Sequence, residues 1–291
     1  MSGDVRRAAA VRERTAVLGR GEVAPGAPVV AADDAGAARG DGVFETLLVL
    51  GGPPVRVVHL DAHLERLARS ARTLDLPAPD LAAWRELAVG LGADVPAGAE
   101  AVLRLSLTRG APGQGPSGLA TLRDVPAALV RARERGVRVV ALTRGTPARV
   151  HAGAPWLLGG AKVLSYAVHT AALREAARRG ADDALLTSTE GLVLEGATSS
   201  AVWAAGGRLL TAPVDGTGVL PGTVQRAVFA GAAAAGVPTG TDLVPVERLR
   251  SADAVWLTSS VRGVVEVTHL DGEPLARRPD LTRRLREWAQ G

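Results

Sequence analysis

The chain has 291 residues, of which 47% are hydrophobic and 22% charged, a composition typical of a globular protein with a substantial core. Its formal net charge of +4, with arginines interspersed among acidic residues, argues against nucleic acid as a partner. Cysteine is absent, which excludes disulfides, thiolate catalysis and cysteine-ligated metals.

The first residues contain no apolar segment of the kind found in secretory signals. The longest apolar run, residues 227–237, is too short to span a membrane. We therefore expect a cytoplasmic enzyme or binding protein with no membrane partner.

The N-terminal half predicts strands followed by helices. Residues 1–15 are rich in Arg and Ala and are expected to form a tail or an added helix. Apolar pairs among Gly and Pro predict strands over 16–30, and apolar residues on both sides of GGPP predict a β-hairpin over 43–58. Helical spacing predicts a helix that Asp61 caps and Pro77 ends, and a second helix over 81–91.

Residues 101–110 alternate as a strand does, and residues 111–118 are expected to form a mobile loop. Residues 127–135 are expected to form a short helix or a connecting segment. A new β-rich part then begins at VRVVALTRG. We expect a helix over 165–179, hairpins over 181–196 and 199–213, a helix starting near Gly222, and further strands. Asp280 is expected to cap a C-terminal helix.

This pattern predicts an α+β chain in two parts, with antiparallel hairpins rather than regular βαβ units. We place the boundary near Arg135–Gly136. The smaller N-terminal α/β domain would then comprise residues 1–135, and the larger β-rich domain residues 136–291.

Lys162, in GGAKVLSYA, is the only lysine in the chain, beside 33 arginines. Asparagine and isoleucine are also absent, which indicates a GC-rich genome in which arginine replaces lysine wherever charge alone is needed. A Schiff base with a carbonyl needs a primary amine, which guanidinium cannot supply. Lys162 is therefore a candidate covalent anchor for an aldehyde cofactor, although chance retention of a surface lysine would give the same pattern.

An enzyme that uses pyridoxal phosphate also needs a carboxylate for the pyridine nitrogen, donors for the phosphate and a partner for the ring oxygen. Glu195 could supply the carboxylate, and Tyr166, four residues after Lys162 or one helical turn, could contact the ring oxygen. The phosphate candidates are Arg66, Gly222, Thr223 and the hydroxyls of residues 258–260. Each has an ordinary alternative: a solvated loop glutamate, a core tyrosine, a surface arginine, a plain helix start or a polar strand end.

Other chemistry has little support in the sequence. His59 and His63 are four residues apart, but no carboxylate stands out as a third ligand, so we expect no metal site. The motifs HExxH, CxxC and GxSxG are all absent.

The ordered segments RGDGVFET, HLERLARSA, AKVLSYA, GLVLEGATSS, LLTAP, GVLPGT and LTSSVRGVVEV resemble the fold-type IV pyridoxal-phosphate enzymes, the class-IV aminotransferase family. The resemblance covers about residues 16–275. It implies a smaller N-terminal and a larger C-terminal domain with pyridoxal 5'-phosphate in the cleft, and a homodimer in which loops of the partner close the site.

The resemblance also implies residue roles. Lys162 would carry the cofactor and move the substrate's Cα proton, Glu195 would pair with the pyridine nitrogen, and Tyr166 would touch the ring oxygen. The phosphate would be held by Arg66, Ser260 and the main-chain N–H groups of Thr223 and Val224. Ser200, Gly222 and Ser259 are also expected to belong to the cofactor-binding site.

Some positions depart from the family pattern. Ser200 stands where the family often has Asn, and LPGTVQR replaces LPGITR, so Val224 offers only its N–H group. D-amino-acid enzymes carry an Arg-x-His motif that binds the substrate carboxylate. This motif is missing after TRG at residues 108–110, which argues against that specificity.

The segment from Lys162 onward most resembles aminodeoxychorismate lyase-like proteins. The resemblance thus implies a lyase that forms 4-aminobenzoate and pyruvate in folate biosynthesis. The alternative is an aminotransferase that moves an amino group from a branched-chain or D-amino acid, or an amine, to a 2-oxo acid. A non-catalytic dimeric interaction protein would bind no cofactor. The candidate substrate-binding residues are Arg39, Phe44, Arg104 and Arg109.

Overall fold

The structure is a computed structural model that describes residues 10–290. The chain divides into two compact units. The first extends to Pro126 and also contains Lys162–Leu164, and the second contains Ala127–Ala161 and the chain from Ser165 onward. The boundary expected at residues 135–136 stays a prediction.

A six-stranded antiparallel sheet forms the first unit in the described part of the chain, in the order β2-β1-β6-β5-β3-β4. Its strands are β1 (Arg14–Val17), β2 (Gly21–Val23), β3 (Gly42–Leu50), β4 (Arg56–Val57), β5 (Glu100–Thr108) and β6 (Ser117–Asp124). The hairpin expected over 43–58 is confirmed as β3–β4. The predicted tail over 1–15 is wrong for Arg14 and Thr15, which pair in β1, while residues 1–9 lie outside the described range.

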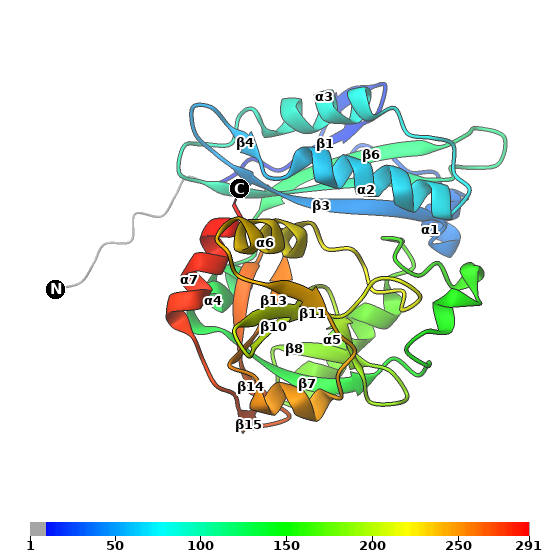
Figure 1. The fold of residues 1–291 in the computed structure, drawn as a ribbon. Coiled ribbons are helices and arrows are strands. Elements are labelled where there is room, and N and C mark those ends of the chain that lie inside the picture. The colour runs from blue at the N-terminus through cyan, green and yellow to red at the C-terminus, as the bar shows by residue number, and fades with distance from the viewer. Residues whose placement is uncertain (1–9, 291) are drawn as a thin grey trace. The chain divides into compact units, whose positions relative to one another are not determined.

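Three helices belong to this unit: α1 (Ala35–Arg39), α2 (Leu60–Thr73) and α3 (Leu81–Gly92). Helices α2 and α3 cover one face of the sheet (Figure 1). The N-cap predicted for Asp61 is wrong, because His59 takes that position and Asp61 lies in the first turn. Helix α2 also ends at Thr73, before Pro77 is reached, since Asp75 turns the chain with a φ of 49°.

Alternation along β3 and β5 divides their side chains between the two faces of the sheet. On β5 the apolar set Ala101, Leu103, Leu105 and Leu107 is buried, whereas the intervening Arg104 is only half-buried. On β3 the residues that face α2 are buried and apolar, with Glu45 as the exception. A glutamate on this apolar face therefore needs partners within the protein.

In the second unit, nine strands of the described chain form one sheet in the order β12-β11-β10-β13-β14-β7-β8-β9, with β15 paired to β14. These strands are β7 (Val137–Thr143), β8 (Asp183–Thr187), β9 (Val193–Gly196), β10 (Ser200–Ala205), β11 (Arg208–Thr211), β12 (Thr239–Thr241), β13 (Ala254–Ser259), β14 (Gly263–Leu270) and β15 (Glu273–Pro274). Hairpins β8–β9 and β10–β11 confirm the predicted pairs.

The expectation of antiparallel hairpins alone is wrong for this unit. Strand β7 runs parallel to β8 and to β14, and β11 runs parallel to β12. Parallel neighbours need a crossover, which α5 (Ala167–Arg178) provides between β7 and β8 and α6 (Thr223–Ala234) provides between β11 and β12. The unit thus contains βαβ connections that hairpin spacing does not reveal.

The remaining helices are α4 (Ala127–Arg135), α7 (Pro279–Trp288) and the 3-10 turns η1 (Val150–Ala152), η2 (Pro155–Leu157) and η3 (Val246–Ser251). The bounds predicted for α4 are confirmed. Asp280 lies in the first turn of α7 rather than at its N-cap, which is Arg278, so that prediction is wrong. Within residues 10–290, none of the helices has the length and apolar character needed to cross a bilayer.

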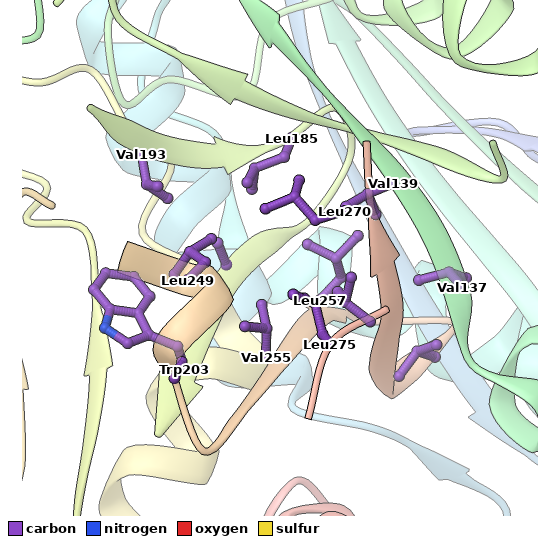
Figure 2. Close-up of a cluster of buried hydrophobic side chains, with 14 residues drawn as sticks. Val137, Val139, Leu185, Val193, Trp203, Leu249, Val255, Leu257, Leu270 and Leu275 are labelled. Atoms are coloured by element: carbon purple, nitrogen blue, oxygen red, sulfur yellow. The ribbon is translucent and has the colours of Figure 1, made fainter. Parts of the chain in front are cut away.

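The core of the second unit is built from aliphatic side chains of its strands and of η3 (Figure 2). Val139, Leu185 and Leu257 are almost fully buried there, and Trp203 is the large aromatic residue of the cluster. A second cluster packs α6 and α7 side by side against β13 and β14. These clusters fix the ends of the strands that carry the polar residues described below.

The close packing at Gly42 yields a stability prediction. A Cβ at Gly42 would lie 2.6 Å from the Leu107 carbonyl oxygen and 2.7 Å from Leu164 Cδ1. We expect Gly42→Ala to lower the free energy of unfolding by about 1–3 kcal/mol in urea titrations. Gly90 is the matched control, because a Cβ there meets open space inside α3. Gly90→Ala should stabilise by about 0.4–1 kcal/mol; equal stability of the two variants would contradict this packing.

Candidate active site

The segment 162–164 is extended and lies along the edge of β3. Val163 pairs with Val43 as an antiparallel bridge, the Phe44 N–H donates to the Lys162 carbonyl at 2.9 Å, and the Leu164 N–H donates to the Gly42 carbonyl at 2.8 Å. The Lys162 N–H donates to Ser70 Oγ, on α2, at 3.1 Å. The main chain of Lys162 is thus fixed to both a strand and a helix of the first unit.

The Lys162 side chain lies on the same face of the sheet as Phe44, since the two residues are opposite each other across the bridge. Lys162 Nζ is 4.4 Å from the centroid of the Phe44 ring, and Arg104 Cζ is 3.9 Å from it. Phe44 is buried, while Lys162 and Arg104 are half-buried. Two cations therefore share contact with one aromatic ring.

Arg66 lies on α2 with Glu45 as its partner. Its Nε and Nη2 donate to the two oxygens of the Glu45 carboxylate, each at 2.8 Å. His63 Nδ1 is 2.6 Å from the same carboxylate. Burial by itself would raise the pKa of Glu45, but the charge of Arg66 and the hydrogen bonds from Arg66 and His63 lower it to about 2. The interpretation of Arg66 as an ordinary surface arginine is therefore wrong.

Glu195 lies in β9 of the second unit and is half-buried. Its Oε2 accepts a hydrogen bond from the Leu220 N–H at 3.1 Å. Arg144, just past the end of β7, attracts this carboxylate: burial lowers the pKa of the Arg144 guanidinium, and the charge of Glu195 opposes that shift. The Glu195 carboxylate thus accepts a main-chain hydrogen bond and interacts electrostatically with a partly buried guanidinium.

Arg144 was not singled out in the sequence. Its Nε donates to Thr146 Oγ1 at 3.1 Å and its Nη1 to the Thr217 carbonyl at 2.9 Å, while its Nη2 is buried without a partner among residues 10–290. The signal that could have found it is an arginine placed between the end of an apolar strand and a glycine turn.

The N-terminus of α6 gathers the hydroxyl and main-chain donors of the second unit. Gly222 is the N-cap residue, and Thr223 and Val224 open the helix with N–H groups that lack an intrahelical acceptor. A Cβ at Gly222 would lie 2.3 Å from Ser200 Oγ, so only glycine lets the chain pass this closely. The Thr223 hydroxyl is 3.5 Å from that of Ser260.

The end of β13 supplies further hydroxyls. Thr258 pairs with Ser200 across the strands, and its hydroxyl is buried with no hydrogen-bond partner in the described chain. Ser259 is the last residue of the strand, and Ser260 follows it in the turn. Hydroxyls, main-chain donors and a helix N-terminus together form a donor set suited to a phosphate.

Tyr166 differs from its predicted setting. Residues 162–166 are not helical, so Tyr166 does not lie one helical turn from Lys162; it is the N-cap residue of α5, which begins at Ala167 rather than Ser165. Its ring stacks on His169 with the centroids 4.6 Å apart. The β-bridge at Val163 competes with helix formation here. The role of Tyr166 at the ring oxygen stays a prediction.

The candidate substrate arginines occupy different environments. Arg39 is exposed in the last turn of α1. Arg109 is engaged by the fold, since its Nε donates to Asp41 at 2.7 Å and its Nη2 to the Leu74 carbonyl at 2.7 Å. Arg104, beside Phe44, shares a sheet face with Lys162. These contacts distinguish the three arginines as candidates for binding a substrate carboxylate, which the sequence could not do.

The residues present fit pyridoxal phosphate by their chemistry. The first unit contributes a primary amine on a fixed main chain and an arginine held by a buried carboxylate. The second contributes a half-buried carboxylate, and hydroxyls beside a helix N-terminus where the buried Thr258 hydroxyl lacks a partner in the described chain. An amine, a carboxylate and phosphate donors are the groups that this cofactor requires.

Comparison with known proteins agrees with this chemistry. Residues 42–270 match the amino-transferase class IV family. A bifunctional aminodeoxychorismate lyase / D-amino acid transaminase from Mycobacterium tuberculosis is 43% identical over 269 residues, which cover 88% of this chain and 90% of that protein. The chain therefore belongs to the class-IV aminotransferase family.

Solved structures show the same fold. A hypothetical aminotransferase from Mycobacterium tuberculosis, in its PLP-bound and its alpha-ketoglutarate and PMP-bound forms, is 41% identical with a TM-score of 0.90, covering 95% of this chain and 98% of that one. The fold IV-transaminase CpuTA1 from Curtobacterium pusillum is 40% identical with a TM-score of 0.89, covering 96% and 98%. The predicted family, α+β fold class and pyridoxal phosphate cofactor are confirmed, and the chain is an enzyme of this family.

The buried Glu45 yields a pH prediction. Unfolded Glu45 titrates near 4.5 and folded Glu45 near 2, so its stabilisation is complete above pH 4.5 and is lost as the pH falls toward 2. The pKa of His63, lowered by burial, adds a loss in the same direction below 6.5. The lowered pKa of Glu45 contributes about 3 kcal/mol to the free energy of unfolding at neutral pH.

The measurement is urea unfolding of the wild type and of Glu45→Gln between pH 7 and pH 3. The wild type should be the more stable at pH 7, and the difference should shrink below pH 4.5 because Gln does not titrate. A difference that stays constant over this range would contradict an ionised, buried Glu45.

Proposed function

We propose that the protein is a pyridoxal-phosphate-dependent lyase that converts 4-amino-4-deoxychorismate to 4-aminobenzoate and pyruvate, a reaction of folate biosynthesis, and that it acts as a homodimer. The observation that carries the proposal is Lys162, the only lysine, whose main chain is fixed to β3 and α2. The name of the relative that is 43% identical supports the lyase activity.

When bound, pyridoxal phosphate supplies an aldehyde and an electron-accepting pyridinium ring. In this proposal Lys162 would anchor that aldehyde, and Glu195, beside Arg144, would pair with the pyridine nitrogen. Tyr166 donates to the ring oxygen. The phosphate is held by Arg66, Ser259, Ser260 and the N–H groups of Thr223 and Val224, with Ser200 and Gly222 shaping this donor set.

With the substrate amine held at the cofactor, Lys162 Nζ would take the proton from the substrate carbon that bears the amine. The C–O bond to the enolpyruvyl group would break as the remaining ring becomes aromatic. Lys162 would deliver the proton to the departing enolpyruvate, which leaves as pyruvate. Arginine could not replace Lys162, because a guanidinium does not lose its proton at a working pH.

An aminotransferase is the second candidate. It would use the same proton transfer at Lys162 but would end with a 2-oxo acid. The 43% identical relative is named for D-amino acid transamination as well, although this chain lacks the Arg-x-His motif after its TRG strand. The alpha-ketoglutarate form of the aminotransferase from Mycobacterium tuberculosis also favours a 2-oxo acid acceptor.

A paired assay separates the two reactions. With 4-amino-4-deoxychorismate and no added 2-oxo acid, the lyase forms 4-aminobenzoate over many turnovers. Steady glutamate formation from 2-oxoglutarate and a D- or branched-chain amino acid, without 4-aminobenzoate, would reject the lyase. Lys162→Ala should lose the visible absorption band and both activities, and Lys162→Arg, which keeps the charge, should fail equally. A wild-type band that persists in Lys162→Ala would overturn the assignment of Lys162.

We further propose that Arg104 binds the substrate carboxylate, since it is half-buried beside Phe44 on the Lys162 face of the sheet. A charge-assisted hydrogen bond of this kind accounts for about 10- to 100-fold in affinity. Arg104→Gln should therefore raise KM by about that factor with a smaller effect on kcat. Arg20, exposed in the β1–β2 turn, gives the charge-matched control Arg20→Gln. Equal KM values for the two variants would exclude Arg104 from this role.

A further inference from the structure

Three ionisable side chains are buried together on the α2 side of the first sheet. Glu45, His63 and Arg66 have exposed fractions of 0%, 0% and 3%. Removing charges from water is costly, and a buried ion pair is often no more stabilising than an apolar replacement. Stability alone therefore explains this cluster poorly. The proposed function uses only Arg66 and leaves Glu45 and His63 without a part.

The hydrogen bonds show which edge of the Arg66 guanidinium contacts Glu45. Nε and Nη2 form the side edge, and both donate to the carboxylate at 2.8 Å in a bidentate pair. The end edge, made by Nη1 and the second hydrogen of Nη2, points in a different direction in the rigid plane. A second anion can therefore meet Arg66 in a bidentate manner only at that end edge.

His63 completes the carboxylate's hydrogen bonds. Burial lowers the pKa of His63 more than the Glu45 carboxylate raises it, so the ring is neutral near pH 7. Its Nδ1, 2.6 Å from the ionised Glu45, must then carry the proton and donate it. Glu45 thus accepts three hydrogen bonds, two from Arg66 and one from His63.

Helix α2 relates this cluster to Lys162. Ser70, one turn after Arg66, accepts the hydrogen bond from the Lys162 N–H at 3.1 Å. A guanidinium that is fixed against Glu45 is therefore also fixed relative to the lysine main chain through one rigid helix. A freely rotating arginine would lose much conformational freedom on binding a phosphate, and a held one loses little.

We propose that Glu45 and His63 are positioning residues that hold Arg66 by its side edge and present its end edge to the phosphate of the cofactor. This inference rests on the proposed role of Arg66 at that phosphate. The negative charge of Glu45 orients Arg66 but also partly cancels the positive charge of Arg66. The phosphate would therefore be recognised through the fixed direction of the guanidinium more than through its net charge. Removing Glu45 should accordingly weaken phosphate binding, although it removes a negative charge from the neighbourhood.

The test compares pyridoxal phosphate with pyridoxal, which lacks the phosphate, as ligands of the full-length chain stripped of cofactor. Glu45→Gln should weaken binding of pyridoxal phosphate by about 10- to 30-fold and leave the affinity for pyridoxal unchanged. The 31P resonance of the bound cofactor should also shift. Glu266→Gln is the matched control, since Glu266 is a buried carboxylate that accepts from Arg277 at 2.8 Å in the second unit. It should lower stability and keep cofactor affinity.

Unchanged or tighter binding of pyridoxal phosphate by a folded Glu45→Gln would overturn the inference. Should that variant fail to fold, His63→Gln keeps the Glu45–Arg66 pair and removes only the ring; a weaker phosphate-specific affinity supports the inference and an unchanged one overturns it. Arg66→Gln identifies the source of a failure. If it binds pyridoxal phosphate as the wild type does, the phosphate role of Arg66 is wrong; if it binds weakly while Glu45→Gln does not, only the positioning role is wrong.

Discussion

The pairing of residues 162–164 with the edge of β3 is the constraint on which the site depends. Two main-chain hydrogen bonds to Gly42 and Phe44, and a third to Ser70, fix the main chain of Lys162. The flanking residues, Ala161 and Ser165, already belong to the second unit. Residues 162–164 are therefore a three-residue segment of the second half of the chain that pairs with the sheet of the first unit. The alternation of side chains along this segment decides on which face of the sheet the Lys162 amine lies.

In each unit a buried or partly buried charged side chain lies near a group of opposite charge. Glu45 faces an apolar helix side and remains ionised only because Arg66 and His63 donate to it. In the second unit Arg144 is partly buried, and Glu195 opposes the resulting shift in its pKa. Each pair costs desolvation that an apolar core would avoid. Buried ion pairs also occur away from the predicted cofactor residues, as between Arg262 and Asp183, so burial of charge alone does not mark the site.

Local patterns predicted much of this structure. Alternation and turn residues gave the hairpins β3–β4, β8–β9 and β10–β11, and helical spacing gave α3 to within one residue of its observed end. The parallel pairing of β7 with β8 and β14 was missed because it joins segments far apart in the chain. For the same reason Tyr166 was wrongly placed one helical turn from Lys162, since residues 162–164 pair with β3, more than a hundred residues earlier.

A site residue could be predicted from the sequence where its chemical role allows only one type of side chain. Lys162 could be found because no other side chain in the chain offers a primary amine. Glu45 could not, because a glutamate inside VFETLLVL gives no local sign of whether its face of the strand is buried. Arg144 gave equally little sign among 33 arginines. The burial of both charges follows from tertiary packing; the position of Arg144 between a strand end and a glycine turn is the one local cue.

The two faces of β5 differ in how deeply their side chains are buried. Ala101, Leu103, Leu105 and Leu107 are buried in the core, so changes there cost stability. Arg104 and Ser106 alternate with them, are only half-buried and belong to the face that carries Phe44 and Lys162. Substitutions in this second set leave the core packing intact while they alter the surroundings of the amine. The proposed lyase and the alternative aminotransferase would both use Lys162, so under that proposal the two would differ in such neighbouring residues rather than in the lysine itself.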